Sequence, residues 1–193
     1  MKVKAVIAVL GLAGAAFAFP AAAQMRSPSL SSAYVGASLG QSKFKFDCGG
    51  LPTCDQTDTA LRLFLGYQFT PNIAAEIGYA DLGKSKLGLG AFNGEVKATA
   101  WDLSAVGLWP LASQFSILGR LGIYHGETKL SGDFGDDKDT KTGALFGLGG
   151  QFDLNRNIGF RAEWNRYNKM GGGNFSDNFN VDVLNVSALY RFQ

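Results

Sequence analysis

The chain has few of the residues on which metal sites and long membrane helices depend. Its 193 residues include one histidine and two cysteines. After Phe19 every apolar stretch is soon broken by glycine or a charge, so we expect no transmembrane helix. Two thiols without a nearby histidine make a poor metal site, and we expect neither a metal nor a cofactor. A formal net charge of only +2 gives no electrostatic case for binding nucleic acid.

The first residues are typical of an export signal. Met1 to Lys4 is basic, an apolar run follows to Phe19, and three alanines precede Gln24. This run is shorter than the roughly 20 residues that a membrane-spanning helix needs. We therefore predict a cleavable signal peptide at 1–23, a short segment at 24–32 and one domain at 33–193. Removal of Lys2 and Lys4 would leave the mature chain neutral.

Glycine and aromatic residues are abundant, and they follow a two-residue period. The chain holds 26 Gly, 15 Phe, 6 Tyr and 3 Trp, a mixture typical of β-structure. In 59–69, Leu61, Leu63 and Leu65 alternate with Arg62 and Gly66. A strand places successive side chains on opposite faces, so one face is apolar and the other carries glycine and charge. This pattern indicates a barrel with an apolar outside and a polar inside.

The same alternation recurs along the whole mature chain. It predicts eight strands, at 33–44, 59–69, 73–82, 96–109, 115–130, 143–154, 158–167 and 180–192. Long connections at 46–58, 83–95, 131–139 and 169–179 alternate with short turns. We predict an all-β, eight-stranded antiparallel transmembrane β-barrel with periplasmic termini and four exposed loops. A soluble barrel would hide its apolar face and spread Lys, Ser and Thr over the wetted one, whereas here the polar face carries Arg and Glu beside glycines.

Four positive and four negative side chains share the predicted inner face. This lumen charge network is Arg62, Glu76, Asp102, Arg120, Asp153, Arg161, Glu163 and Arg191. A balanced, hydrogen-bonded set is the usual way to retain buried charges. The network is either a structural plug or a set of groups that rearranges to pass ions. If Arg161→Ala leaves a buried carboxylate unpaired, it should destabilise the barrel by several kcal/mol, roughly 3–5.

Aromatic residues gather near both ends of the predicted strands, as in the interfacial girdles of membrane proteins. The girdle prediction comprises Tyr67, Phe69, Tyr79, Trp101, Trp109, Trp164, Tyr190 and Phe192.

The placed strands resemble the outer-membrane protein A transmembrane-domain family. The resemblance is carried by the order and spacing of several short stretches: 66–72, Glu76-Ile77-Gly78-Tyr79, 149–154, Arg161-Ala162-Glu163-Trp164 and Tyr190-Arg191-Phe192. It implies location in the outer membrane of a Gram-negative bacterium, a lumenal pair between Glu76 and Arg161, and a C-terminal strand that the barrel-assembly machinery recognises. Gln151 and Val106 stand where family members can carry acidic and basic lumenal groups.

Four further features of the sequence bear on possible binding or catalysis. In an exported protein Cys48 and Cys54 favour a disulfide within one loop. His125 resembles the histidine of small lipid A deacylases, but Glu127 stands where their serine would be, so we predict no enzymatic activity. Asp133, Asp136, Asp137 and Asp139 lack the spacing of a calcium loop and indicate a solvated acidic loop. Arg166 and Lys169 are candidates to meet lipopolysaccharide phosphates.

The expected function is a non-enzymatic envelope role, in membrane integrity or in surface contact through the loops. A narrow channel for ions or small solutes is the alternative, and a lipid A-modifying enzyme comes third. The expected partners are outer-membrane lipid, lipopolysaccharide and the barrel-assembly machinery. The residues of the loops do not identify an external ligand.

Overall fold

A computed structural model describes residues 32–45, 53–55, 57–89, 92–132, 137–170 and 179–192. The predicted signal peptide and Cys48 lie outside these residues. The strands are β1 (Ser32–Lys45), β2 (Thr53–Asp55), β3 (Thr57–Thr70), β4 (Ile73–Leu89), β5 (Phe92–Pro110), β6 (Phe115–Gly132), β7 (Asp137–Asp153), β8 (Ile158–Met170) and β9 (Phe179–Arg191). Within the described residues no helix is long and apolar enough to cross a membrane.

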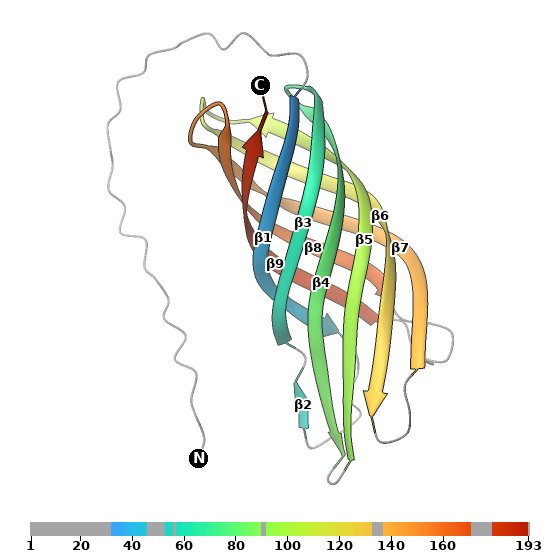
Figure 1. The fold of residues 1–193 in the computed structure, drawn as a ribbon. Helices are drawn as coiled ribbons and strands as arrows, with labels where there is room; N and C mark the ends of the chain where they lie inside the picture. The colour runs from blue at the N-terminus through green and yellow to red at the C-terminus, as the bar shows by residue number, and fades with distance from the viewer. Residues whose placement is uncertain are drawn as a thin grey trace, which may run out of the picture.

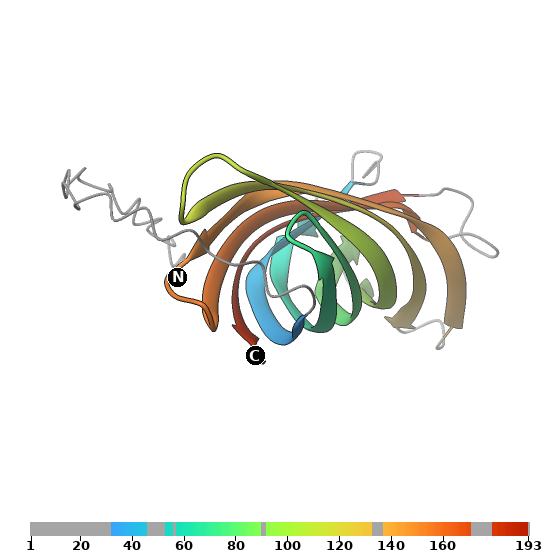
Figure 2. The ribbon, with the colours of Figure 1, turned by 90° about the horizontal axis from the view of Figure 1, so that it is seen from above.

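Eight of these strands form a closed antiparallel barrel, as the alternation predicts. Each strand pairs with its neighbour in the sequence, β1 also pairs with β9, and the β4–β5 pairing completes the ring. The short β2 pairs only with the far end of β4. Figure 1 shows the strands tilted around the barrel, and Figure 2 looks onto the end that carries the short turns. A closed barrel leaves no free edge within its ring.

Two of the short turns are each stabilised by hydrogen bonds from backbone amides to a side-chain oxygen at the start of the turn. Thr70 Oγ1 accepts hydrogen bonds from the amides of Asn72 and Ile73, at 3.3 and 3.0 Å. Asn155 Oδ1 accepts from Asn157 and Ile158, at 2.9 and 2.8 Å. Such local side-chain acceptors favour a tight reversal of the chain. These turns lie at the same end as both termini of the barrel, so the other end carries the long connections (Figure 1).

The outward-facing side chains form a continuous apolar band. Leu63 on β3, Leu121 on β6, Leu148 on β7 and Leu184 on β9 are all about 62–66% exposed to solvent in the isolated chain. We call this surface the apolar band. Exposed leucines on every side of a barrel are typical of a surface that faces lipid.

The long connections are shorter than the composition indicated. Residues 83–95 were expected to form a loop, but β4 extends to Leu89 and β5 begins at Phe92. Residues 131–139 were also expected to be a loop, but β7 already begins at Asp137. A bulge in β4 explains the first error. The pairing shifts register between Asp81 and Lys84, and Gly83 has φ of +80°, which reverses the alternation beyond that point.

Candidate functional site

All eight charged residues of the predicted network point into the barrel. Seven are buried, and Asp153 is half-buried near the short-turn end. They come from β3 to β9, with Glu76 on β4 at the centre of the set. The inward assignment follows from strand alternation, because each residue lies between two outward-facing apolar neighbours.

Glu76 is the hub of the network. One of its carboxylate oxygens accepts from Arg120 Nη1 at 2.7 Å and from Arg62 Nη1 at 3.3 Å. The other accepts from Arg161 Nη1 and from the Tyr34 hydroxyl, the latter at 2.8 Å. One carboxylate therefore binds three guanidinium groups, and charge-assisted hydrogen bonds of this kind are the strong ones.

Two further carboxylates balance two of these arginines. Arg62 forms a two-pronged contact with Asp102, at 2.8 Å from Nε and 2.6 Å from Nη2. Arg120 contacts Glu163 at 3.0 Å and donates to Ser104 Oγ at 2.8 Å. These contacts satisfy most of the remaining guanidinium donors, as buried charges require.

Gln151 connects this cluster to the charges near the short turns. Arg161 Nε donates to Gln151 Oε1 at 2.6 Å, and Gln151 Nε2 donates to Asp153 Oδ1 at 3.1 Å. Arg191 Nη2 donates to the same Asp153 oxygen at 2.7 Å. All eight predicted residues thus belong to one connected network. Sequence reasoning did not include Gln151 or Tyr34 in it, although both have inward alternation.

Apolar side chains cover the network on both sides, which sequence reasoning also missed. Toward the long connections, the inner face carries Phe44, Leu82, Tyr124, Leu145 and Tyr167 in one cluster. Toward the short turns, Phe64, Leu108, Leu118 and Leu189 belong to a second cluster. A cavity beside Arg62 has a volume of about 10 Å³, which is close to one water molecule. The lumen is therefore filled by a charged layer around Glu76 between two apolar layers, and the Arg191–Asp153 pair lies nearest the short turns.

The eight predicted girdle aromatics all lie on the outer surface of the barrel. Tyr67 and Phe69 contact edge to face near the short turns, with ring centroids 5.1 Å apart. Tyr79 and Trp101 contact at 5.0 Å at the opposite edge of the apolar band. Aromatic rings at both edges of an apolar band are typical of the two membrane interfaces.

An ion cluster lies just beyond the apolar band on β8 and β9. Arg166 donates to both carboxylate oxygens of Asp182, at 2.7 and 3.0 Å, and Lys45 contacts Asp182 at 2.7 Å. The hydrogen bonds from Arg166 lower the pKa of the Asp182 carboxyl, and Lys45 adds to this effect against the opposing effect of partial burial. Arg166 also stacks over Trp164. Lys169, the second residue predicted to meet lipopolysaccharide phosphates, is exposed at the end of β8 and has φ of 57°.

The other candidate residues are only partly described. His125 is exposed on the outer face and its Nδ1 lies 3.1 Å from Thr142 Oγ1. Asp133 and Asp136 lie outside the described residues, whereas Asp137 and Asp139 belong to β7 rather than to a loop. In the described part of the chain no group of three or more His, Cys, Asp or Glu side chains is placed to hold a metal ion. Only the backbone of Cys54 is described, so the disulfide with Cys48 stays a prediction.

A closed barrel with an apolar outside, two aromatic edges and a charged inside is an integral outer-membrane β-barrel. The chain belongs to the family described as outer membrane protein beta-barrel domain, whose model matches residues 7–192. It resides in the outer membrane of a Gram-negative bacterium.

Curated relatives support the same family. The chain is 30% identical over 202 residues to outer membrane protein A of Escherichia coli O157:H7, covering 100% of this chain and 55% of that protein. It is 29% identical over 201 residues to outer membrane protein A of Shigella flexneri, covering 100% of this chain and 56% of that protein. The chain therefore spans about half the length of the curated relatives it matches.

Solved structures share the fold. Neisserial surface protein A superposes with a TM-score of 0.67 at 15% identity, covering 84% of this chain and 99% of that one. Ail, the attachment invasion locus protein of Yersinia pestis, superposes with a TM-score of 0.58 at 22% identity, with coverage of 84% and 99%.

Proposed function

We propose that this protein acts as a closed envelope protein whose functional surface is its outward end rather than its lumen. The observation that carries this proposal is the filled lumen, in which apolar layers lie on both sides of a paired charge network. A barrel built in this way anchors whatever it presents to the cell exterior. The proposed role is non-enzymatic.

Four strands supply the outward surface. β4, β5, β6 and β7 have 17, 19, 18 and 17 residues, whereas β1, β3, β8 and β9 have 13 or 14. A tilted strand needs roughly 9–11 residues to cross a membrane. We call residues 84–89, 92–97, 127–132 and 137–142 the outer extension. Figure 1 shows these strands continuing past the rest of the barrel at the end opposite the short turns.

A surface role for this extension agrees with the names of two fold neighbours, a surface protein and an attachment protein. The likeness to these neighbours is one of fold, so attachment by the present chain is part of the proposal. Three further partner assignments also remain proposals: outer-membrane lipid around the apolar band, lipopolysaccharide phosphates at Arg166 and Lys169, and the barrel-assembly machinery at the C-terminal strand.

A narrow pore is the rival function. Its supporting observation is the hub itself, because three arginines that share Glu76 provide alternative partners for one carboxylate. We favour the closed barrel because a rearrangement of charges would leave the two apolar layers in place. Planar-bilayer conductance separates these two functions.

The experiment that tests the proposed function removes the tip of the outer extension. Residues 85–96 and 130–137 are each replaced by Asn-Gly, a two-residue turn that suits a hairpin. Each deletion ends at a directly opposed pair, Lys84 with Lys97 and Lys129 with Lys138. Cells that lack the protein are complemented with the full chain or with the trimmed chain.

We expect both chains to restore resistance to detergent, and only the full chain to restore attachment of the cells to one another and to a surface. Heat-dependent gel mobility of the extracted proteins controls for folding. Equal attachment by cells with the two chains would contradict the proposed role of the outer extension in attachment.

A further inference from the structure

A small cavity lies inside the barrel where the charge network meets an apolar layer. Its volume is about 10 Å³, and residues of β1, β3, β4, β8 and β9 line it. The lining includes Arg62 from the charge network, and Leu82 and Val183 from the apolar cluster toward the long connections. A cavity needs roughly 10–15 Å³ of this kind to hold one water molecule. The space therefore suits one water and no larger ligand.

Asn165 brings an unsatisfied polar group to this cavity. Its side chain lines the cavity and is 5% exposed, and its Oδ1 has no hydrogen-bond partner among the described residues. Gly147, directly opposite on β7, has no side chain and so leaves room for one end of the amide. The other end can use a water either as donor or as acceptor. An amide buried without a hydrogen bond is costly, so a partner from the protein or from ordered water is expected.

Two further polar side chains at the cavity form only long hydrogen bonds. Ser38 Oγ donates to the carbonyl oxygen of Arg62 at 3.4 Å, and Asn185 Oδ1 accepts from Ser187 Oγ at 3.4 Å. Hydrogen bonds from hydroxyl groups to oxygen are normally about 2.7–2.8 Å long, so both groups keep capacity for a closer partner. With Asn165, three polar side chains from β1, β8 and β9 surround the space of one water. A buried water typically makes about three hydrogen bonds.

We propose that this cavity binds one water molecule, which forms hydrogen bonds with the Asn165 amide, Ser38 and Asn185. The water joins β1, β8 and β9 at the outer side of the charge network. An apolar occupant would leave the Asn165 amide unpaired. A cation would be repelled by the guanidinium group of Arg62, and the volume excludes polyatomic anions.

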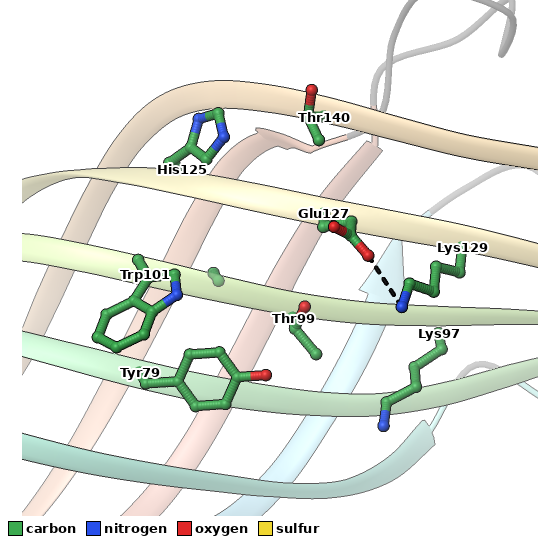
Figure 3. A pocket seen from close by; sticks show the side chains of 9 residues that line it. Tyr79, Lys97, Thr99, Trp101, His125, Glu127, Lys129 and Thr140 are labelled. Atoms are coloured by element: carbon green, nitrogen blue, oxygen red, sulfur yellow. Dashed lines mark ion pairs between the residues drawn. The ribbon is translucent and has the colours of Figure 1, made fainter.

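The larger hollow in Figure 3 cannot hold a water in this way. It has a volume of about 300 Å³ and lies on the outer wall, where exposed side chains such as Trp101, His125 and Thr140 line it. Water there exchanges freely with the exterior. In the cavity beside Arg62, every lining residue except Leu61 is buried. The enclosed water should therefore stay bound far longer than water in the outer hollow.

This inference goes beyond the proposed function, because it concerns the lumen and not attachment by the outer extension. One enclosed water gives ions no path while the two apolar layers remain in place. Attachment of cells and occupancy of the cavity are separate measurements. Failure of one proposal therefore leaves the other intact.

The first test measures the water directly by nuclear magnetic resonance on the full chain refolded in nanodiscs. Transfer of magnetisation from water to the side-chain amide protons of Asn165 is recorded in the laboratory frame and in the rotating frame. A trapped water gives opposite signs in the two frames, whereas proton exchange with bulk water gives the same sign. We expect opposite signs at Asn165 and no such signal at the ring N–H of Trp101. Absence of this transfer at Asn165 would mean a dry cavity and would overturn the proposal.

The second test fills the cavity with side chains matched in size. Ala80 is buried on β4 and lines the cavity, and valine and threonine there differ only by a methyl or a hydroxyl group. Either side chain displaces the water, but only the threonine hydroxyl can replace it as a partner of Asn165. We expect a higher urea unfolding midpoint for Ala80→Thr than for Ala80→Val. An equal or higher midpoint for Ala80→Val would contradict a bound water, because an apolar side chain fills a dry cavity better.

Ala100 provides the matched control. It lies opposite Ala80 on β5 and is equally buried, at 1% exposure, but it does not line the cavity. Ala100→Val should be at least as stable as Ala100→Thr, because a hydroxyl there gains nothing from Asn165. The order expected at Ala80, if it also appeared at Ala100, would reflect a general preference for threonine and would overturn the proposal. If an Ala80 variant does not fold, as judged by heat-dependent gel mobility, the magnetisation transfer in the wild type decides.

Discussion

At the scale of single residues, Glu76 contributes most to the charge network. It is buried, and it neutralises Arg62, Arg120 and Arg161 together. Glu76→Gln keeps the shape but leaves these guanidinium groups short of one negative charge. Breaking a buried ion pair by removing one partner typically costs about 3–5 kcal/mol. We expect a loss of this size in urea unfolding of the refolded barrel, followed by heat-dependent gel mobility.

Two comparisons keep this prediction specific. Glu127→Gln makes the same chemical change in an exposed pair with Lys129 on the outer rim, where little loss is expected. Arg161→Ala should cost less than Glu76→Gln, because Arg62 and Arg120 still neutralise the hub. Glu76→Gln with an unfolding midpoint equal to that of Glu127→Gln would contradict the hub assignment.

Alternation alone placed all eight charged residues on the inner face, because it depends only on each residue's position within its own strand. Alternation did not show which of these charged side chains form ion pairs with one another. Gln151 joins the network because strand register places it directly opposite Arg161 on the neighbouring strand. Tyr34 joins it by reaching Glu76 two strands away, a contact that also depends on barrel diameter. The apolar layers also have inward alternation, but in the sequence only charge and glycine mark the inner face, so these apolar residues were not predicted.

At the scale of elements, the outer extension depends on the bulge in β4. Gly83 has φ of +80°, and a Cβ there would lie 2.7 Å from the carbonyl oxygen of Thr59. Its amide donates to Asp81 Oδ1 at 3.0 Å, and the next amide donates to Asp58 Oδ2 at 2.7 Å. Gly83→Ala should cost at least about 1–2 kcal/mol. Hydrogen exchange at the outer ends of β4 and β5 should accelerate more than exchange within the apolar band.

Gly119→Ala is the matched control for this prediction. Its Cβ would meet only the ring of Trp109, at the ordinary contact distance of 3.4 Å. Exchange in the outer extension should therefore stay at the wild-type rate. Unchanged exchange in Gly83→Ala as well would mean that the bulge does not hold the extension.

The same bulge explains why the sequence did not predict the extension. Before it, the outward residues of β4 are odd-numbered, ending at Asp81, and after it Lys84 faces outward. A count that assumes an unbroken period of two therefore ends the strand at Leu82. The glycine- and lysine-rich composition that follows has low intrinsic strand propensity, and cross-strand pairing with β5 overrides it.

The Asp182 cluster joins the outer ends of β1, β8 and β9. The pKa of Asp182 is lowered in the folded barrel by Arg166 and Lys45. This contribution to stability is therefore complete above the ordinary Asp pKa, about 3.9, and is lost as pH falls through the lowered value. We expect the wild type to be more stable than Asp182→Asn at neutral pH and the difference to vanish in strong acid, as measured by unfolding midpoints across this range.

Because the comparison is a difference between two chains, other carboxylates that titrate in the same range cancel. Salt should reduce the difference at neutral pH, since the cluster is partly exposed. A difference that stays constant from neutral to acid pH would show that the carboxylate charge of Asp182 does not contribute.

At the scale of the whole molecule, three surfaces have separate physical roles. The apolar band places the barrel in the membrane, the filled lumen closes it, and in the proposed function the outer extension meets the exterior. On the outer wall, Lys84, Lys97, Lys129 and Lys138 become cross-strand neighbours only when four strands pair in register, so no local pattern in the sequence reveals this arrangement.

The closed lumen leads to the last prediction, which concerns conductance. The refolded wild type should give no steady openings in a planar bilayer, because apolar side chains fill the lumen on both sides of the charge network. Glu76→Gln and Arg161→Ala should also stay silent, since neither change removes an apolar layer. A charge-gated pore would instead open, or change its conductance, on either substitution. Heat-dependent gel mobility confirms the folded state, and a porin added at the end confirms that the bilayer reports openings. Steady openings of the folded wild type would contradict the closed barrel and support a narrow pore.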